Sequence, residues 1–104
     1  MTIVNLTPHA VALNTGETFA PSGNIARVAA TYSDPDERGV CKVGFGAVTG
    51  VPEAQDGTLY VVSALVSKAL ASRPDVVSPA TGHPHAVRNE KGHIVSVPFF
   101  VKEQ

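Results

Sequence analysis

The stretch from Asp56 to Ser72 reads DGTLYVVSALVSKALAS, and it decides the fold. Gly57 marks a turn, and the apolar, β-prone residues 59–62 that follow are typical of a buried strand. From residue 63 onwards the apolar side chains recur at close to the helical spacing of 3.6 residues. Ser63 stands between the two patterns, where serine commonly caps a helix. The stretch therefore predicts a strand that leads directly into one principal helix over residues 63–72.

The same spacing predicts which side of this helix is buried. The apolar side holds Val62, Leu65, Val66, Ala69 and Leu70, and the opposite side holds Ser67, Lys68, Ala71 and Ser72. The free N–H groups of the first turn could hold an anion, which makes Ser63 a candidate ligand-binding residue, although Ser63 can satisfy those groups itself. A nucleophile elbow is excluded, because Val61 and Leu65 stand where that sharp turn needs glycine.

Short β-prone runs and turns make up the rest of the chain. The predicted strands are 3–6, 11–13, 17–20, 25–30, 40–49, 86–88 and 93–97. Turns at 14–17 and 89–92 predict two hairpins. The segment 75–85 contains two prolines and a glycine, so we expect an irregular loop, which at this length is typical of a binding or interface element. One helix among many strands predicts an α+β fold: a single small domain over residues 1–104 with mainly antiparallel sheet.

Two further patterns concern the segment from 25 to 49. Arg27 is expected in the middle of its strand, and residues 34–38 form a polar loop whose acidic side chains we expect to be only solvated. In the strand 40–49, Gly44 and Gly46 share one face, and bare backbone there permits close approach by a flat ligand or another subunit. A bulge or bend is the alternative.

Composition bounds the function. Eight Lys and Arg stand against nine Asp and Glu, so the overall charge does not favour a nucleic acid duplex or an anionic membrane. Cys41 is the only cysteine, which favours a reducing compartment. The sequence shows no export signal and no apolar stretch of membrane-spanning length. We therefore expect a soluble, cytoplasmic protein without a membrane partner.

The residue types usual in catalysis and metal binding are sparse. His83 and His85 flank a proline, but no cysteine or suitably spaced carboxylate joins them, so surface histidines are favoured over a metal site. Cys41 lacks the local signature of a thiol enzyme and is more typical of a small buried hydrophobe. Glycine-rich phosphate loops are absent from the sequence. We expect no catalytic residue, no metal and no cofactor.

Three arginines on structured segments are the remaining candidates. Arg27, Arg73 and Arg88 carry guanidinium groups, which fork onto phosphate oxygens and stack on adenine. With Tyr60 or Phe99 nearby they would suit a nucleotide-like ligand. The alternative is that they form surface ion pairs, Arg73 with Asp75 and Arg88 with Glu90.

Several motifs resemble a family of small phage and prophage proteins, over nearly the whole chain. They are Asn5-Leu6-Thr7-Pro8-His9, Pro21-Ser22-Gly23 with Ala26-Arg27-Val28, Val51-Pro52-Glu53 followed by Asp56-Gly57-Thr58, Tyr60-Val61-Val62-Ser63 with Leu65-Val66, and Val87-Arg88-Asn89-Glu90 with Gly92-His93-Ile94-Val95. Within this group the chain is most similar to the first-described Thoeris anti-defence sponges, phage proteins that sequester cyclic ADP-ribose signals made by bacterial TIR-domain defences.

The resemblance implies a homo-oligomer, with a hexamer assembled from dimers as the expected form, that binds its ligand without cleaving it. It also implies a separate site for cyclic oligonucleotides. Arg27 and Arg88 match by motif the arginines that meet phosphates, Asn89 shares the motif of Arg88, and Arg73 is a weaker match. An aromatic ring and an amide should hold the adenine. Tyr60 or Phe99 could supply the ring, but Ser72 stands where the amide is expected, which leaves the identity of the cyclic nucleotide open.

Three functions remain open at this point. The first is a non-catalytic sponge whose pocket lies between subunits or beneath the 75–85 loop. The second is a phage structural or assembly protein without a nucleotide ligand, which would use Phe99, Phe100 and the face of Gly44 and Gly46 for subunit contact. The third is a hydrolase that acts on such a nucleotide.

Overall fold

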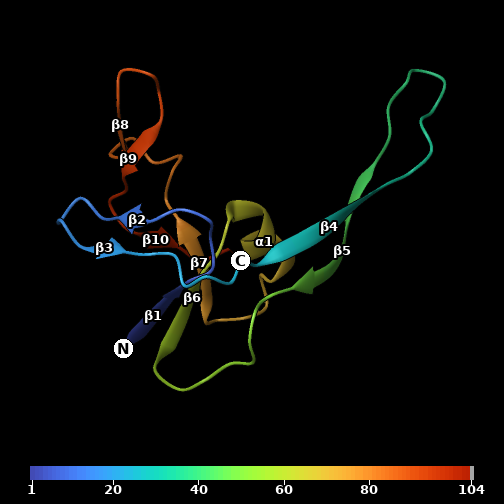
Figure 1. Cartoon of the computed structure of the whole chain (residues 1–104). Helices are drawn as coiled ribbons and strands as arrows, with labels where there is room; N and C mark the ends of the chain where they lie inside the picture. The colour runs from blue at the N-terminus through green and yellow to red at the C-terminus, as the bar shows by residue number, and fades with distance from the viewer. Residues whose placement is uncertain (104) are drawn as a thin grey trace.

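A computed structural model describes residues 1–103, and a four-stranded sheet forms its centre (Figure 1). The strands lie in the order β1 (Thr2–Asn5), β6 (Thr58–Val61), β7 (Val76–Pro79) and β10 (Phe100–Val101). β6 pairs in parallel with β1 and with β7, and β10 pairs antiparallel with β7. Of the six strand pairings within residues 1–103, four are antiparallel and two parallel. The predicted α+β fold is confirmed, whereas the parallel pairings of the central sheet were not predicted.

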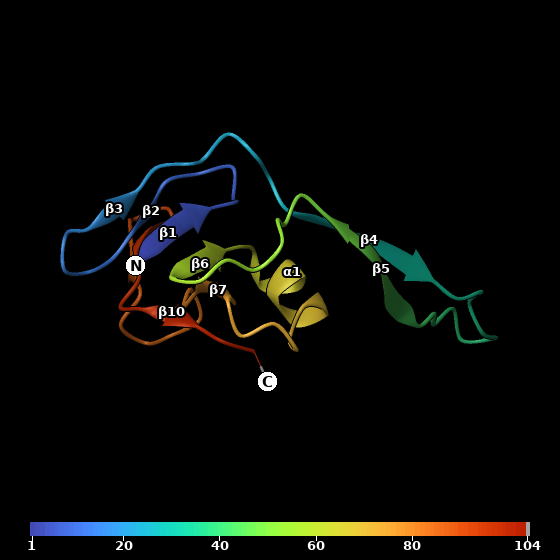
Figure 2. The same ribbon diagram turned by 90° about the horizontal axis from the view of Figure 1, so that it is seen from below.

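The helix α1 (Ala64–Ala69) connects the two parallel inner strands. Ser63 is its N-cap, as predicted: the backbone N–H of Val66 donates to Ser63 Oγ at 3.4 Å. The chain leaves β6, turns into α1 and returns to the sheet as β7, so these three elements form a strand–helix–strand crossover. In Figure 2, α1 lies beside the inner strands, and it contacts β7.

The core lies between α1 and the sheet. Its buried residues are Leu6, Ala26, Tyr60, Val62, Val66 and Val76. The predicted helix face is wrong in two places: Leu65 is 47% exposed, and Ser67 is fully buried. A six-residue helix that contacts β7 buries only a narrow stripe, and the stripe found here runs through Val66 and Ser67.

The prediction of an irregular segment over 75–85 is wrong in its first half. Residues Val76–Pro79 form β7, an inner strand whose residues Val76, Val77 and Ser78 are buried. The prolines at 74 and 79 lie just before the strand and at its last residue, where they need not interrupt the ladder. The remainder, Ala80–Ala86, holds turns and no strand.

Two short hairpins lie together at one side of the sheet. The first pairs β2 (Val11–Ala12) with β3 (Thr18–Phe19), and the second pairs β8 (Val87–Arg88) with β9 (Ile94–Ser96); both pairings are antiparallel, as the predicted turns require. Asn14 ties the two together, because its Nδ2 donates to the carbonyl of His85 at 2.9 Å and its Oδ1 accepts from Ser96 Oγ at 2.6 Å. In the last strand, the ring of Phe100 packs against Phe19 with centroids 5.8 Å apart.

A third hairpin projects away from the sheet. β4 (Arg27–Tyr32) and β5 (Val43–Thr49) pair only with each other, and together with the loop between them they form what we call the arm, residues 27–49 (Figures 1 and 2). Because of the arm, the radius of gyration is 15.4 Å, above the roughly 13 Å expected for a compact chain of this length. Arg27 is the first residue of β4, not a mid-strand residue as predicted.

The two glycines of β5 lie against the neighbouring strand. The register shifts between Val28 and Ala30, so that Gly46 and Ala47 together oppose Ala29, which is a β-bulge. A Cβ atom added at Gly46 would lie 3.2 Å from the carbonyl oxygen of Ala29. The bulge that the sequence analysis gave as the alternative is therefore present at Gly46, whereas Gly44 lies in the regular ladder opposite Thr31.

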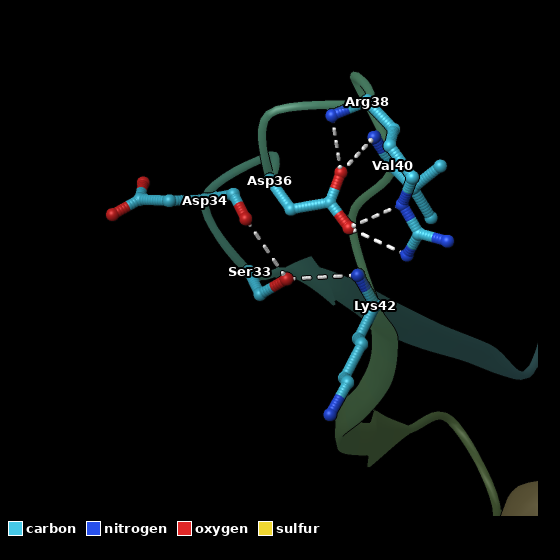
Figure 3. A network of polar contacts seen from close by, with 6 residues as sticks. All are labelled: Ser33, Asp34, Asp36, Arg38, Val40 and Lys42. Carbon is cyan, nitrogen blue, oxygen red and sulfur yellow. Dashed lines mark hydrogen bonds and ion pairs between the residues drawn. The ribbon is translucent and has the colours of Figure 1, made fainter.

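The tip of the arm is ordered by side chains (Figure 3). Asp36 Oδ1 accepts from the backbone N–H groups of Arg38 at 2.9 Å and Val40 at 3.1 Å, while its Oδ2 accepts from the Arg38 guanidinium at 2.7 Å. These hydrogen bonds hold the pKa of the Asp36 carboxyl below its usual value, and the bonds from the Arg38 side chain have the largest effect. The expectation that the acidic residues of this loop are only solvated is wrong for Asp36, which organises the turn.

Within residues 1–103, no helix has the length and apolar character needed to cross a membrane.

Candidate functional site

The structure does not bring the three predicted arginines together. Arg27 is exposed at the root of the arm, Arg73 follows α1, and Arg88 lies in the β8–β9 hairpin on the other side of the sheet. None of the three depressions described below is lined by any of these residues. None of these three depressions therefore gathers the three arginines.

Arg73 is committed to an ion pair. Its Nε and Nη2 donate to the two carboxylate oxygens of Asp75 at 3.0 and 2.6 Å, and the side chains are 26% and 12% exposed. The hydrogen bonds from Arg73 lower the pKa of Asp75, and those same bonds raise the pKa of Arg73. The guanidinium also lies 5.9 Å from the ring centroid of Tyr60. The ion-pair alternative is thus the one realised for Arg73.

Tyr60 and Ser63 have structural roles. Tyr60 is 2% exposed within the core, and its hydroxyl donates to the carbonyl of Glu53 at 3.3 Å, so its ring offers no free face to a base. Ser63 is exposed and caps α1.

Arg88 and Asn89 build the turn of their hairpin. Asn89 Oδ1 accepts from the backbone N–H groups of Lys91 at 2.9 Å and His93 at 3.1 Å. Arg88 donates to the carbonyls of Gly92 at 2.8 Å and Thr81 at 3.0 Å. The proposed pairing with Glu90 is not among the ion pairs within residues 1–103. Since neutral carbonyls accept its bonds, the charge of Arg88 is not neutralised by a carboxylate.

Two larger depressions lie at opposite ends of the inner strands. The one at the amino ends of β6 and β7 has a volume of about 350 Å³ and is lined by Asp56 and Asp75 among others. The one at the carboxyl end of β7, which we call the β7 pocket, has a volume of about 320 Å³. Its lining residues are Ala64, Lys68, Ser78, Pro79, Ala80, Thr81, Gly82, His83, Val101 and Glu103. The first depression is lined by no Lys, Arg or His side chain, whereas the second is lined by Lys68 and His83, so we take the β7 pocket as the candidate site for an anion.

Three kinds of polar group surround the β7 pocket. Lys68 reaches it from the last turn of α1, and His83 reaches it from the loop after β7. Arg88 adds a second positive charge close by, because it bonds to the carbonyl of Thr81, a lining residue. Glu103 lies on the same lining and supplies an acceptor. The pocket therefore offers cationic donors together with one carboxylate.

Ser78 adds an unsatisfied hydroxyl to this lining. It shares a strand face with Val76, which packs against Val66 of α1, so Ser78 also faces the helix side of the sheet. The residue is 1% exposed, and its Oγ has no hydrogen-bond partner within residues 1–103. A buried hydroxyl left unpaired costs about 1–3 kcal/mol, and an orphan of this kind in a pocket lining calls for a ligand or water as its partner.

Sequence reasoning located this pocket only in part. The 75–85 segment was singled out as a binding element, and six of the lining residues, Ser78 to His83, lie in it. Lys68 and Glu103 were missed, because they belong to a helix and to the chain end, which only the fold brings together. His83 was considered as a metal ligand; in the structure its ring lies edge-on to Phe99, with centroids 4.9 Å apart.

The Asn5-Leu6-Thr7-Pro8-His9 motif is a structural element. Asn5 is 2% exposed at the end of β1, and all its amide atoms are used. Its Nδ2 donates to the carbonyls of His9 at 2.8 Å and Phe19 at 3.0 Å, and its Oδ1 accepts from Thr7 N at 2.9 Å and Thr7 Oγ1 at 2.6 Å. The motif thus closes the turn after β1 and attaches β3 to it.

Within residues 1–103, no three His, Cys, Asp or Glu side chains are grouped so that they could hold a metal ion. Comparison with known proteins finds no matching family model, no matching curated protein and no matching solved structure.

Proposed function

We propose that the protein is a non-catalytic sponge that binds and sequesters a cyclic ADP-ribose-type nucleotide in the β7 pocket, and that it acts as a phage anti-defence protein in the host cytoplasm. The observation that carries the proposal is the combination of Lys68, His83 and the carboxylate of Glu103 on the lining of one concavity, with Arg88 bonded to the carbonyl of the lining residue Thr81.

Each group matches a part of a nucleotide. Phosphate oxygens are held by ammonium groups, and Lys68 supplies one on the pocket lining. Arg88, bonded to the carbonyl of Thr81, adds a positive charge outside the lining. Ribose hydroxyls commonly donate to a carboxylate, which is the role assigned to Glu103. Binding needs no chemical step, so the ligand leaves the pocket unchanged.

The volume of the pocket supports a shared site. Ligand pockets usually measure roughly 300–1,000 Å³, so about 320 Å³ is at the small end. A pocket of this size holds the phosphates and one ribose of a cyclic nucleotide and leaves the base outside. We propose that a second copy in a homo-oligomer covers the rest.

Nucleotide capture by the whole chain tests this proposal. The protein is mixed in excess with cyclic ADP-ribose isomers and, separately, with cyclic dinucleotides; free nucleotide is measured by filtration, and bound nucleotide is recovered by heating. We expect depletion of one nucleotide class and its intact recovery. No depletion of any nucleotide would overturn the sponge, and a cleaved product would indicate a hydrolase.

Two charge reversals test whether the β7 pocket is the binding site: Lys68→Glu, and Lys42→Glu as its matched control. Both lysines are exposed, but only Lys68 lines the β7 pocket. We expect Lys68→Glu to weaken capture at least tenfold, since it replaces an attraction for phosphate by a repulsion, and Lys42→Glu to change it less than twofold. Equal capture by the two variants, both shown to be folded by circular dichroism, would contradict the assignment to this pocket.

The alternative, a phage structural or assembly protein without a nucleotide ligand, is favoured by a different observation. The arm exposes Tyr32, Val43 and Phe45 at 70%, 61% and 46%, on a hairpin that contributes little to the core. Such a protein would form an oligomer and would deplete no nucleotide in the same capture experiment.

A further inference from the structure

The arm lacks a packing partner within its own chain. Beyond the root residues Val28 and Val48, which pack on the core, none of its residues belongs to the core or packs against it in residues 1–103. An isolated two-stranded hairpin is marginally stable in water and usually needs a third strand or a covering surface. Yet the turn at its tip is ordered by Asp36 (Figure 3), and its alternate residues Val43 and Phe45 present an exposed apolar face. The arm is built as a defined surface that another surface should cover.

The body of the molecule carries a surface of matching chemistry. Between the β2–β3 and β8–β9 hairpins lies an apolar groove with a volume of about 170 Å³, lined by Ala10, Val11, Ala12, Pro79, Thr81, Ile94, Val95 and Val97. The residues Val87, Val95 and Phe99 on or beside the β8–β9 hairpin are 46%, 54% and 46% exposed. Together these residues form a second uncovered apolar surface, which we call the β9 groove.

Charge is also complementary between the two surfaces. At the arm tip, Asp36 is paired with Arg38, whereas the structure records no ion pair for Asp34 or Glu37 within residues 1–103. Figure 3 shows the Asp34 carboxylate pointing away from the tip. Beside the β9 groove, Arg88 and Lys91 outnumber Glu90. With Asp34, Asp36 and Glu37 against Arg38 and Lys42, the tip has one net negative charge, and the groove edge has one net positive charge.

The two surfaces cannot meet within one copy. Figure 1 shows the arm extending from one side of the central sheet and the β8–β9 hairpin standing on the other, in a molecule whose longest dimension is 50 Å. We propose that the arm of one copy docks in the β9 groove of a second copy, so that two copies exchange arms about a two-fold axis. In such a dimer, a contact of the arm with the groove is necessarily formed twice.

The area of contact favours this reciprocal arrangement. Only the part of the arm beyond its root can dock, because Val28 and Val48 pack on the core of their own copy. Residues 43–47 of β5 span about 17 Å and a two-stranded ribbon is about 10 Å wide, so one docked arm covers about 170 Å². Each copy gives one arm and receives one, which amounts to about 340 Å² per copy and about 700 Å² in total, the size of a weak interface. A single arm contact would bury half of this. We therefore expect a weak, reversible dimer.

The single cysteine makes the contact directly testable. Cys41 is exposed and lies between the arm tip and β5. The wild-type chain, as an equal mixture of ¹⁴N- and ¹⁵N-labelled protein, is modified at Cys41 with a maleimide photo-crosslinker, irradiated and analysed by mass spectrometry. We expect crosslinked peptides of mixed isotope that join Cys41 to residues 81–99. Crosslinks of single isotope only, or mixed ones that reach other segments, would overturn the proposal.

The substitutions Phe45→Ser and Leu65→Ser form a matched pair that tests how the arm contributes to the affinity of the dimer. Both side chains are exposed to nearly the same extent, 46% and 47%, but only Phe45 lies on the arm. By sedimentation equilibrium, we expect Phe45→Ser to raise the dissociation constant of the dimer at least tenfold and Leu65→Ser to change it less than twofold. A monomeric wild-type protein, or equal effects of the two substitutions, would contradict arm exchange. This measurement contains no nucleotide, so failure of arm exchange and failure of nucleotide capture are detected in separate experiments.

Discussion

Replacing Asn5 by alanine gives the sharpest test of how the fold is held together. The amide of Asn5 makes four hydrogen bonds in a site where the residue is 2% exposed, and these bonds connect the end of β1 to the turn at Thr7–His9 and to β3. Alanine removes all four bonds at once. It leaves the N–H of Thr7 without this acceptor, and the carbonyl of Phe19 without this donor.

The expected cost follows from these contacts. A net contribution near 1 kcal/mol for each hydrogen bond gives about 4 kcal/mol, and partial replacement by water at the rim lowers this to about 2–4 kcal/mol. That is a large share of the roughly 5–15 kcal/mol by which a domain of this kind is stable. Asn5→Asp should cost as much at neutral pH, because a carboxylate cannot donate to the carbonyls of His9 and Phe19.

Urea unfolding followed by circular dichroism measures the effect, and Asn14→Ala is the control. Asn14 also bonds through both ends of its amide, to His85 and Ser96, but it is exposed, so that water replaces these bonds at little cost. We expect the unfolding midpoint to fall by at least about 1 M urea for Asn5→Ala and by less than about 0.5 M for Asn14→Ala. Equal shifts for the two variants would refute the argument from burial.

Two further predictions concern the sheet and its connections. Asp75→Asn should lower the free energy of unfolding by about 1.5–3 kcal/mol at pH 7, because it breaks the bidentate pair with Arg73. The pKa of Asp75 is lowered from its ordinary value of 3.8, so the ion pair is present above that value and is lost as the pH falls through the lower pKa of the folded state. Urea titrations should therefore show the unfolding free energies of the wild type and Asp75→Asn becoming equal in acid. A difference between them that stays constant with pH would contradict this. Gly50→Ala should destabilise the protein by about 2 kcal/mol or more, because Gly50 has φ of +85° and an added Cβ would overlap the carbonyl of Ile25. Gly57→Ala is the control: Gly57 has φ of +73° but open space around it, so this substitution should cost only about 1 kcal/mol. Thermal unfolding of the two variants measures both costs.

Local signals in the sequence were sufficient for much of the fold. The Ser63 cap, the two hairpin turns and the α+β class followed from turn residues, periodicity and the position of one serine. The strand β7 was missed because its two valines lie between prolines, and proline is ordinarily a sign of irregular structure. Burial of Val76–Ser78 between β6 and β10 outweighs that local signal, and no local pattern reports such pairing.

The site was harder to predict, because its residues are neighbours only in space. Arginines were chosen for their chemistry, but Arg73 is neutralised by Asp75, two residues away, and Arg27 lies on the arm. Lys68 and Glu103 carry no signal of their own in the sequence. Their proximity depends on α1 crossing over β7 and on β10 pairing beside it, and neither pairing could be derived from residue types alone.

Stability and assembly should be separable in this chain, because they depend on different residues. The core is formed by residues at the sheet, at α1 and at the root of the arm, while Val43 and Phe45 farther out contribute nothing to it. Exposed apolar side chains on a hairpin outside the core lower the solubility of a protein unless another surface covers them. At protein concentrations too low for the dimer to form, a substitution at Phe45 should therefore leave the unfolding midpoint unchanged, and one at Asn5 should lower it. If substitutions at both residues altered both properties, the arm would be part of the folding unit. Its exposed face would then need a packing partner within the same copy, which the extended position of the arm does not provide.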